Sequence, residues 1–483
     1  MTGMLRSIRE TMNLQFHNSL TRRLEPFQPL DGAHVRLYTC GPTVYHFAHI
    51  GNFRAYIFED ILRRTLQVAG YRVTQVMNLT DVDDKTIRGS MQAGVPLQVF
   101  TRPFIDAFFE DLRALNIEPA EVYPAATAHV PEMIAIIQRL FERGLAYRSE
   151  DGSVYFKVSA YPAYGKLAHL DLSSLKAGAR VAQDEYEKES VGDFALWKGW
   201  DERDGDVVWD SPWGRGRPGW HIECSAMAMK YLGETFDLHT GGIDNLFPHH
   251  ENEIAQSEGA TGKPFVRTWM HCAHLCVNGE KMSKSLGNFY TLRDLIAKGY
   301  TGREIRYVLI NGHYRQPLNF TFDALDAARA TLARADEFAD RLAETATPDP
   351  GAERALPVWA GRARDAFDAA VSNDLNIPEA LAAFFAVVRE GNSAMQTRAL
   401  PVAAAAAVRD LVALMDRVLG VLAFGRRAAD DTLPADVAER LAQRALARQT
   451  KRWSDSDRLR DEIAKLGWEV RDEKDGQKVK RKP

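Results

Sequence analysis

The chain has 483 residues, of which 45% are hydrophobic and 26% are charged, and its formal net charge is −4. This balance is ordinary for a soluble globular protein, and the sequence has no run of about 20 apolar residues that would span a bilayer. Four cysteines are too few for a disulfide scaffold. We therefore expect a cytoplasmic protein with no membrane partner, and the net charge by itself gives no sign of nucleic-acid binding.

We expect no export signal in residues 1–22, because they contain scattered arginines and lack the apolar segment of a secretory signal. A second methionine stands at position 12. We expect residues 1–11 to be a poorly ordered extension.

Predicted strands and helices then alternate. Residues 35–40 alternate in polarity like a strand, residues 53–66 carry apolar side chains at helical spacing, and residues 71–79 are extended again. A strand, a helix and a second strand in this order predict the start of a Rossmann-like parallel sheet, whose ligands bind at the carboxyl ends of the strands. The pattern also predicts helices over residues 100–115 and 131–144, a buried strand over residues 269–277 and a well-packed loop over residues 209–220. Residues 225–232, 248–257 and 294–298 continue the alternation of helices and strands.

The fold class is therefore α/β, with a sheet domain that is interrupted once. Its two halves span residues 1–144 and 207–320, and shorter strands and turns at residues 145–206 indicate an inserted connective subdomain. Ala/Leu-rich segments then predict an antiparallel helical bundle over residues 321–430. Its helices are expected at residues 321–346, 355–371, 378–390 and 399–424, and a linker at residues 425–434.

Residues 431–483 form a small C-terminal α/β module in this prediction. Its pattern is mainly helical, with a possible strand at residues 468–470. The last residues, 478–482, are strongly basic, and we expect them to be a solvated, disordered tail.

The first candidate site is the tetrapeptide His49-Ile50-Gly51-Asn52, which begins the first predicted helix. A helix N-terminus offers free backbone N–H groups and a positive dipole end, which suit phosphate. Gly51 would let a nucleotide lie directly against the backbone, and His49 and Asn52 can donate hydrogen bonds to phosphate oxygens. An equally good interpretation of these four residues alone is a histidine that caps the helix.

The second candidate is the loop Lys281-Met282-Ser283-Lys284-Ser285. Its two lysines can close over a triphosphate and neutralise the charge that builds on departing pyrophosphate. A loop of this kind is by itself usually a solvated turn. Together with the first tetrapeptide, however, it resembles the signature of class I aminoacyl-tRNA synthetases. The resemblance implies that His49, Asn52, Lys281 and Lys284 act on ATP and its Mg²⁺, with Asn52 standing where the archetype has histidine.

A possible metal site combines Cys40, Cys224, His249 and Glu253. Two thiolates, an imidazole and a carboxylate are a plausible zinc set. The spacing lacks a tight Cys-x-x-Cys pair, so spacing alone favours buried structural cysteines and a surface acidic helix.

The sequence segments around these residues resemble those of cysteinyl-tRNA synthetases, and the resemblance extends from about residue 14 to residue 477. The matching segments are residues 38–45, 78–85, 164–167, 193–198, 209–214, 219–227 and 247–253. The resemblance implies that Cys40, Cys224, His249 and Glu253 hold one zinc ion in the amino-acid pocket. It places Gly41, Thr80, Trp220 and His239 beside the amino acid, although Trp220 could equally belong to the core.

Zinc in that pocket would explain how the protein distinguishes cysteine from serine. An apolar pocket separates near isosteres poorly, whereas zinc binds a thiolate far better than a hydroxyl. We therefore expect the metal to contact the substrate sulfur, so that no editing domain is needed.

Two other clusters invite a metal interpretation that we do not favour. Cys272 and Cys276 belong to an alternating segment that predicts a buried strand with free thiols. Asp81, Asp83 and Asp84 stand where a helix is about to begin, and we expect them to cap it and to form internal salt bridges instead of binding magnesium.

The C-terminal residues 435–477 resemble the anticodon-reading module of the same family. Arg448, Asp457 and Asp472 are our candidates for contacts with anticodon bases, which need both donors and acceptors, and Trp453 either stacks on a base or packs internally. The alternative is an amphipathic helix with surface ion pairs.

The resemblance implies tRNA(Cys), L-cysteine and ATP as partners, and we expect a monomer. Two rival functions remain at this point. The first is a cysteine ligase that acts on an amino sugar, and the second is a non-catalytic tRNA-binding relative.

Overall fold

The computed structural model describes residues 12–170, 192–283, 286–345, 354–422, 435–450, 452–473 and 476–481. The predictions for residues 1–11 and for the linker at residues 425–434 lie outside these ranges. The chain divides into two compact units, residues 1–424 and 425–483, which are described separately.

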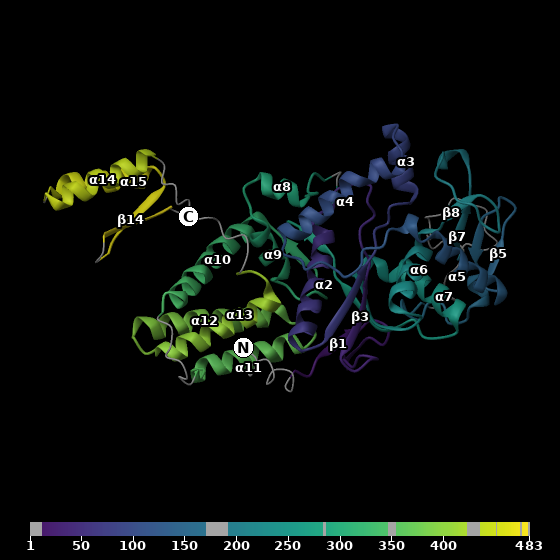
Figure 1. Ribbon diagram of the computed structural model, residues 1–483, viewed down its shortest axis with the longest axis horizontal. Helices are drawn as coiled ribbons and strands as arrows, with labels where there is room; N and C mark the ends of the chain where they lie inside the picture. Colours follow the sequence, from purple (N-terminus) through teal and green to yellow (C-terminus); the bar gives the residue numbers. More distant parts are fainter. Residues whose placement is uncertain are drawn as a thin grey trace. The chain divides into compact units, whose positions relative to one another are not determined.

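The first unit is built on a four-stranded parallel sheet (Figure 1). The strand order is β10-β9-β3-β4, and β3 pairs in parallel with β4 and with β9. The four strands are β3 (His34–Thr39), β4 (Arg72–Met77), β9 (Phe236–Gly242) and β10 (Val266–Cys272). Both faces of the sheet are covered, and most residues of these four strands are buried, polar ones included. The predicted Rossmann-like sheet, with its β3-α2-β4 start, is confirmed.

Two hydrophobic clusters cover the sheet from opposite sides. One cluster contains the apolar side of α2 (Ile50–Val68) and continues into α9 (Gly302–Ile310) and the helical bundle. The other joins α5 (Val130–Glu142), α6 (Trp220–Leu232) and α7 (Glu251–Thr261) to the insertion. Figure 1 shows α2 with the bundle on one side of β3, and α6 and α7 on the other.

The insertion forms an antiparallel sheet of order β5-β6-β7-β8. Its strands are β5 (Ala146–Arg148), β6 (Val154–Phe156), β7 (Phe194–Gly199) and β8 (Gly216–Pro218). Strand β8 lies beyond the expected end of the insertion, inside the segment predicted as a loop, so that prediction is wrong at this point. Its Gly and Pro residues are typical of turns, but Gly216 is needed for close pairing, because a Cβ there would lie 2.2 Å from the Lys198 carbonyl oxygen.

Helices of the bundle follow the predicted ranges closely. They are α10 (Phe322–Ala343), α11 (Val358–Ser372), α12 (Ile377–Gln396) and α13 (Val402–Leu419). Shorter elements complete the unit: β1 (Gln15–Asn18), β2 (Arg23–Pro26), α3 (Asp84–Ala93), α4 (Leu97–Ala114), β11 (Leu275–Val277), β12 (Glu280–Lys281), α8 (Leu292–Ala297) and β13 (Leu318–Phe320).

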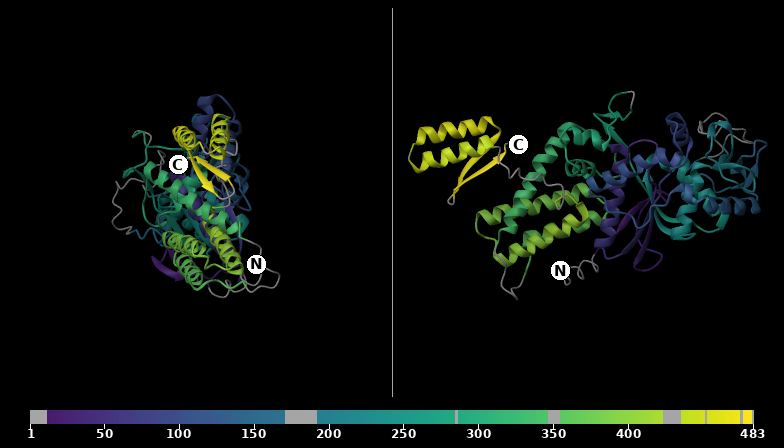
Figure 2. Two further views of the ribbon diagram at one scale, coloured as in Figure 1. Left: turned by 90° about the vertical axis from the view of Figure 1, so that its left-hand side faces the viewer. Right: turned by 45° about the horizontal axis from the view of Figure 1, so that its top comes forward.

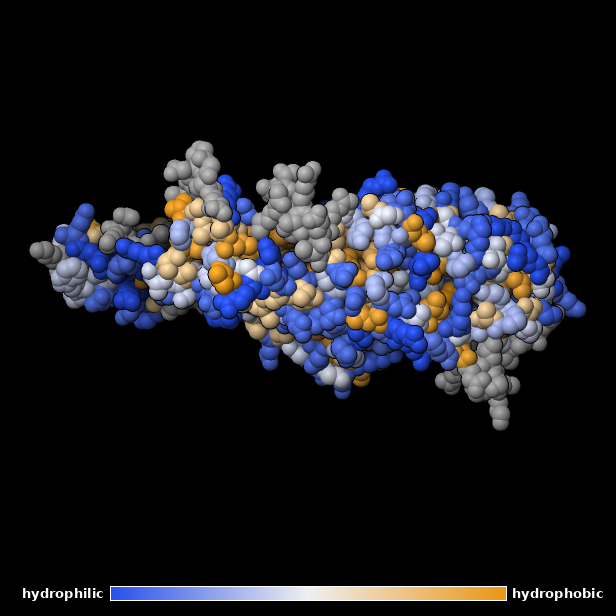
Figure 3. All heavy atoms as spheres, turned by 90° about the horizontal axis from the view of Figure 1, so that it is seen from below, coloured by the Kyte–Doolittle hydropathy of each residue, from blue (hydrophilic) through white to orange (hydrophobic). Residues whose placement is uncertain are grey.

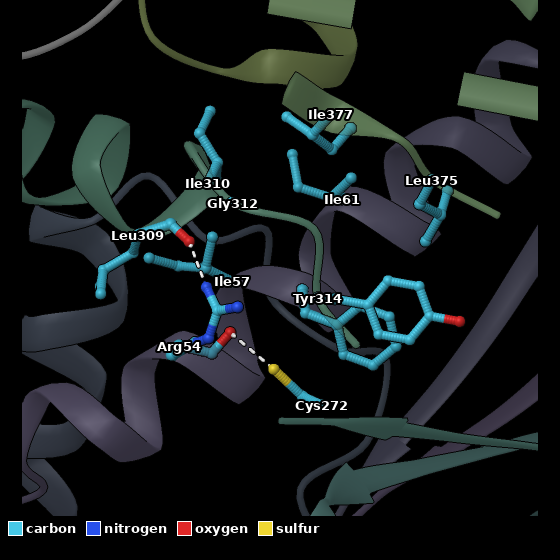
Figure 4. A pocket seen from close by; sticks show the side chains of 11 residues that line it. Arg54, Ile57, Ile61, Cys272, Leu309, Ile310, Gly312, Tyr314, Leu375 and Ile377 are labelled. Atoms are coloured by element: carbon cyan, nitrogen blue, oxygen red, sulfur yellow. Dashed lines mark hydrogen bonds between the residues drawn. The ribbon is translucent and has the colours of Figure 1, made fainter. Parts of the chain in front are cut away.

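A small pocket marks the junction between the sheet domain and the bundle (Figure 4). Arg54 of α2 lines it and donates hydrogen bonds to the carbonyls of Leu309, His313 and Gln316. Figure 4 shows this guanidinium beside the thiol of Cys272, which approaches the Arg54 carbonyl at 3.9 Å. Burial raises the pKa of Cys272 to about 12, so this thiol stays protonated and inert.

The strand predicted over residues 269–277 is in fact two strands. Strand β10 ends at Cys272, and β11 belongs to a separate sheet of order β12-β11-β13. The chain leaves the first sheet at Ala273, whose N–H donates to the Tyr314 carbonyl. Cys272 is buried, as expected, but Cys276 is only half-buried.

The second unit packs two helices against a hairpin (Figure 2). Its elements are α14 (Ala435–Gln449), α15 (Trp453–Lys465), β14 (Trp468–Glu473) and β15 (Gly476–Arg481). Val437, Ile463, Trp468 and Val470 form its core. Strand β15 pairs with β14 along its length, so the prediction of disorder is wrong for residues 478–481.

Figure 3 shows a face on which hydrophilic residues predominate and hydrophobic residues occur in small groups. Among the described residues, no helix is both long enough and apolar enough to cross a membrane.

Candidate active site

Four potential metal ligands converge near the carboxyl end of β3. Cys40 directly follows that strand, Cys224 lies on α6, and His249 and Glu253 lie in the turn before α7 and in its first turn. One ligand atom from each residue lies within 4.8 Å of all the others. His249 and Glu253 are 2% and 0% exposed, so the alternative of a surface acidic helix is wrong.

Glu253 is held from two sides inside this cluster. Its Oε1 lies 3.1 Å from the Nε2 of His249, and its Oε2 lies 3.0 Å from the Nε2 of His239. The other ring nitrogen of His249, Nδ1, lies 2.9 Å from the Nδ1 of His221. Ligating histidines characteristically have their second nitrogen held in this way.

Negative charge is concentrated in the cluster. A hydrogen bond from Cys40 lowers the pKa of Cys224 to about 6, against the opposing effect of burial. Burial would lower the pKa of His249, but the Cys224 thiolate and the Glu253 carboxylate outweigh it and raise that pKa to about 10. The same two anions would attract a divalent cation, and their soft and hard donors together fit zinc.

A second possible set overlaps the first. It consists of Cys40, His239, His250 and Glu253. The Nε2 of His250 lies 3.2 Å from the Cys40 sulfur, and its Nδ1 lies 2.9 Å from the Nε2 of His271. This set has one thiol where the first has two, so the first set is the better match to a thiophilic metal.

The residues expected beside the amino acid lie around the cluster in different ways. Gly41 packs so closely that a Cβ there would lie 1.8 Å from the Asn78 carbonyl oxygen. Trp220, the first residue of α6, is half-buried and stacks on His249 with ring centroids 4.3 Å apart. His239 is fully buried and contacts the cluster through Glu253.

Thr80 is the fourth of these residues. Its hydroxyl accepts a hydrogen bond from the Nδ2 of Asn78 and donates one to Glu223, which is 1% exposed. Thr80 therefore connects the loop after β4 to helix α6, beside the metal cluster.

The N-terminus of α2 carries a capping box. The Nδ1 of His49 accepts from the N–H of Asn52 at 3.2 Å, and the Oδ1 of Asn52 accepts from the N–H of His49 at 3.1 Å. The capping interpretation of His49 is thus confirmed. The other side-chain nitrogens of these two residues, which the cap does not use, are the Nε2 of His49 and the Nδ2 of Asn52.

The lysine loop lies against this helix start, although the two motifs are far apart in the sequence. The N–H of Ile50 donates to the Tyr290 carbonyl at 3.0 Å. A Cβ on Gly51 would lie 3.1 Å from the Cε of Met282. The glycine therefore permits the close approach of the loop.

Asn288 fixes the described part of the loop. Its Oδ1 accepts from the N–H of Ser283 at 2.8 Å, and its Nδ2 donates to the Lys281 carbonyl at 3.2 Å. Lys281 is exposed on β12, whereas Lys284 and Ser285 lie outside the described residues.

The three aspartates after β4 are structural, as expected. Asp83 caps α3 by accepting from the backbone of that helix. Asp84 forms ion pairs with Lys198, at 3.0 Å, and with Arg217 of the insertion. Asp81 accepts a hydrogen bond from the hydroxyl of Thr127.

In the second unit, Asp472 pairs with Arg448 at 3.0 Å and with the buried Arg444 at 2.8 Å. The guanidinium of Arg448 also lies over the Trp453 ring at 5.8 Å. Asp457 is exposed on α15, and its carboxylate makes no hydrogen bond or ion pair within the described residues. Arg448 and Asp472 thus already form an ion pair, as the alternative interpretation of this module expected.

Several buried residues of the site were not identified from the sequence. His250 and His271 are 0% and 4% exposed, and the Nδ1 of His271 lies 2.7 Å from the Ser19 hydroxyl. A signal was present, since His250 stands beside a predicted ligand. Its role could not be separated from that of His249 without knowing that helix α7 begins after a turn.

Comparisons with known proteins agree over nearly the whole chain. Residues 26–330 match the family of class I (C) tRNA synthetase catalytic domains, residues 366–423 match the DALR domain, and residues 430–479 match the cysteinyl-tRNA ligase anticodon binding domain. A cysteine–tRNA ligase of Protochlamydia amoebophila (strain UWE25) is 52% identical, and the alignment covers 97% of this chain and 98% of that protein. A cysteine–tRNA ligase of Chlamydia pneumoniae is 50% identical with the same coverage.

Solved structures support the fold at much lower identity. Mycobacterium tuberculosis methionyl-tRNA synthetase in complex with methionyl-adenylate has a TM-score of 0.56 and 16% identity, over 80% of this chain and 90% of that one. The ternary complex of Agrobacterium radiobacter K84 agnB2 LeuRS, tRNA and LeuAMS has a TM-score of 0.59 and 13% identity, over 82% and 85%. Its sequence relatives and its parallel-sheet fold show that the chain belongs to the cysteine–tRNA ligase family of class I tRNA synthetases.

Proposed function

We propose that the protein activates L-cysteine with ATP and transfers it to tRNA(Cys). The observation that carries the proposal is the convergence of Cys40, Cys224, His249 and Glu253 at the carboxyl end of β3. A thiophilic cluster at the ligand-binding edge of a class I synthetase sheet suits an amino acid whose distinguishing group is a thiol. Family membership supports both the ATP-dependent step and the tRNA step.

In the first step the cysteine carboxylate attacks the α-phosphorus of ATP and releases pyrophosphate. A carboxylate is already ionised, so the protein needs no general base and works by positioning and charge stabilisation. His49 and Asn52 would hold phosphate oxygens at the start of α2. Lys281 and Lys284 would neutralise the departing pyrophosphate, together with the Mg²⁺ that accompanies ATP.

We assign Cys40, Cys224, His249 and Glu253 as zinc ligands. Zinc, when bound there, supplies a Lewis acid that prefers the substrate thiolate to the hydroxyl of serine. His239 and His221 would hold Glu253 and His249 in orientation, and Trp220 would close one side of the pocket by packing on His249.

In the second step a hydroxyl of the terminal ribose of tRNA attacks the cysteinyl-adenylate and releases AMP. Residues 431–483 would read the anticodon through Arg448, Asp457 and Asp472. Breaking the ion pair between Arg448 and Asp472 would then be part of RNA binding. We place the activity in the reducing cytoplasm, since four free cysteines are stable there, and we expect a monomer.

ATP–pyrophosphate exchange tests this proposal directly. We expect exchange that depends on cysteine, followed by cysteinylation of tRNA(Cys). Exchange without charging of tRNA would favour the amino-sugar ligase, and the absence of exchange with cysteine would contradict activation altogether.

A further inference from the structure

A group of aromatic side chains, two of them exposed and three half-buried, lies beside the start of α2. We call it the aromatic surface, and it consists of Tyr45, His46, Phe47, Phe104 and Phe289. Tyr45 and Phe47 are 37% and 36% exposed, although large apolar rings usually point inward. None of the functions described above uses these rings.

The rings form a continuous path toward the ATP motif. Phe104 of α4 packs edge-on against Phe47, with centroids 5.3 Å apart. His46 lies parallel to the ring of Phe104 and edge-on to Phe289. Phe289, in turn, lies 5.0 Å from the ring of His49. The path therefore runs from an exposed edge to the residue that begins α2.

Cations lie at the exposed edge of this surface. The Nζ of Lys85 lies 5.1 Å above the Tyr45 ring, and Lys85 pairs with no carboxylate in the part of the chain that the structure describes. Arg88 is exposed one turn farther along α3, so both cations face the same side of that helix. Arg293 lies 5.3 Å from the Phe47 ring, but Glu110 already neutralises it at 2.7 Å.

Exposed aromatic rings next to unpaired cations are typical of surfaces that bind single-stranded nucleic acid. Bases stack on the rings and cations meet the backbone phosphates, with little dependence on base sequence. We propose that the aromatic surface binds the unpaired 3′ end of tRNA and guides its terminal ribose to the adenylate. This inference rests on the proposed function, because only the transfer step requires RNA at this edge of the sheet.

The test compares two RNAs with one set of variants. The RNAs are tRNA(Cys) and the same tRNA without its unpaired 3′ nucleotides. The variants are Phe47→Ala and Phe104→Ala, with Phe47→Tyr as the version that keeps a ring. Trp200→Ala is the matched control, because Trp200 is 40% exposed and lies under Arg215 but has no ring contact with the aromatic surface.

We expect each alanine variant to raise the Kd for complete tRNA about tenfold and to leave the Kd for the shortened tRNA unchanged. Phe47→Tyr and Trp200→Ala should bind both RNAs like the wild type. Cysteine-dependent pyrophosphate exchange, measured without tRNA, should keep its rate and its KM for ATP in every variant.

Alanine variants that bind both RNAs more weakly by the same factor, or that bind both as tightly as the wild type, would overturn the inference. A higher KM for ATP in the alanine variants would also overturn it, because the rings would then contact the adenine of ATP. If the wild type itself showed no exchange with cysteine, the proposed function would fail. If the wild type did show this exchange, but the alanine variants bound the complete and the shortened tRNA with the same change in Kd, only the role of the aromatic surface would be contradicted.

Discussion

At the scale of single residues, the metal cluster depends on side chains that hold one another in place. Glu253 is fully buried, and two histidines within 3.1 Å lower its pKa against the effect of burial. A carboxylate without such partners would be costly at this depth. The arrangement keeps Glu253 ionised and oriented toward the thiols.

Cys224→Ser should remove the metal. A hydroxyl is a far poorer zinc ligand than a thiolate, so we expect the zinc content after dialysis to fall from about one ion per chain to below about one tenth. Cys276→Ser makes the same chemical change outside the cluster and should keep the full content. Elemental analysis of both variants measures this, and an unchanged zinc content in Cys224→Ser would contradict the ligand assignment.

Gly41→Ala should destabilise the protein. The new Cβ would lie 1.8 Å from the Asn78 carbonyl oxygen, so backbone must move, at a cost of about 2 kcal/mol or more. Gly361→Ala is the control, because nothing lies within 4 Å of its Cβ and it lies inside α11. There we expect a gain of about 0.5 kcal/mol. Urea unfolding compares the two, and equal midpoints would contradict the predicted clash.

At the scale of elements, loops connect the bundle to the sheet domain. Asp374, between α11 and α12, is 2% exposed and accepts from the His17 N–H at 2.8 Å and from the Tyr314 hydroxyl at 2.6 Å. It also pairs with Arg315 at 2.5 Å. One carboxylate thus joins β1, the loop after α9 and the bundle.

Asp374→Asn should weaken this junction. Asparagine tolerates the positive φ of 55° at this position, so the substitution removes the charge without straining the backbone. We expect a loss of about 2 kcal/mol in the free energy of unfolding, because hydrogen bonds to a buried charged group are strong. Asp365→Asn, on the exposed side of α11, should change it by less than about 0.5 kcal/mol. Chemical denaturation that gave equal values for the two variants would exclude this role.

The sequence predicted long periodic elements well and short ones poorly. Helices α10 to α13 repeat apolar residues over many turns, so their pattern is clear. Strand β8 has three residues among Gly and Pro, and its partner β7 is what makes it a strand. Strand β15 is basic, and only its pairing with β14 reveals it.

In the candidate site, too, some features could be predicted from the sequence and others could not. The four proposed ligands, Cys40, Cys224, His249 and Glu253, were identified because the sequence segments around them resemble those of cysteinyl-tRNA synthetases. Their spacing alone favoured buried structural cysteines and a surface acidic helix. The contacts of His239 and His271 could not be predicted, because they depend on how β9, β10 and α7 meet in space.

At the scale of the whole molecule, the chain consists of two compact units with separate cores. The metal cluster and the ATP motif lie in the first unit, and the segment that matches an anticodon binding domain lies in the second. Two contacts with one RNA are expected to raise its affinity far above that of either contact alone.

A chain that ends at Phe424 should therefore keep activation and lose efficient charging. We expect cysteine-dependent exchange within about twofold of the full-length rate and a fall of about a hundredfold in kcat/KM for tRNA(Cys). Steady-state kinetics of both reactions measure this. Charging at the full-length efficiency would show that the second unit does not bind tRNA.

The central claim is that zinc held by Cys40, Cys224, His249 and Glu253 selects cysteine, and its most direct test is the preference for cysteine over serine with and without metal. Pyrophosphate exchange should be measured with each amino acid on the zinc-loaded protein, after chelation, and after zinc is restored. We predict that kcat/KM favours cysteine by more than about 10⁴ with zinc, that chelation reduces this ratio to roughly 10, and that added zinc restores it. A ratio that stays the same after the metal has been removed would contradict the claim.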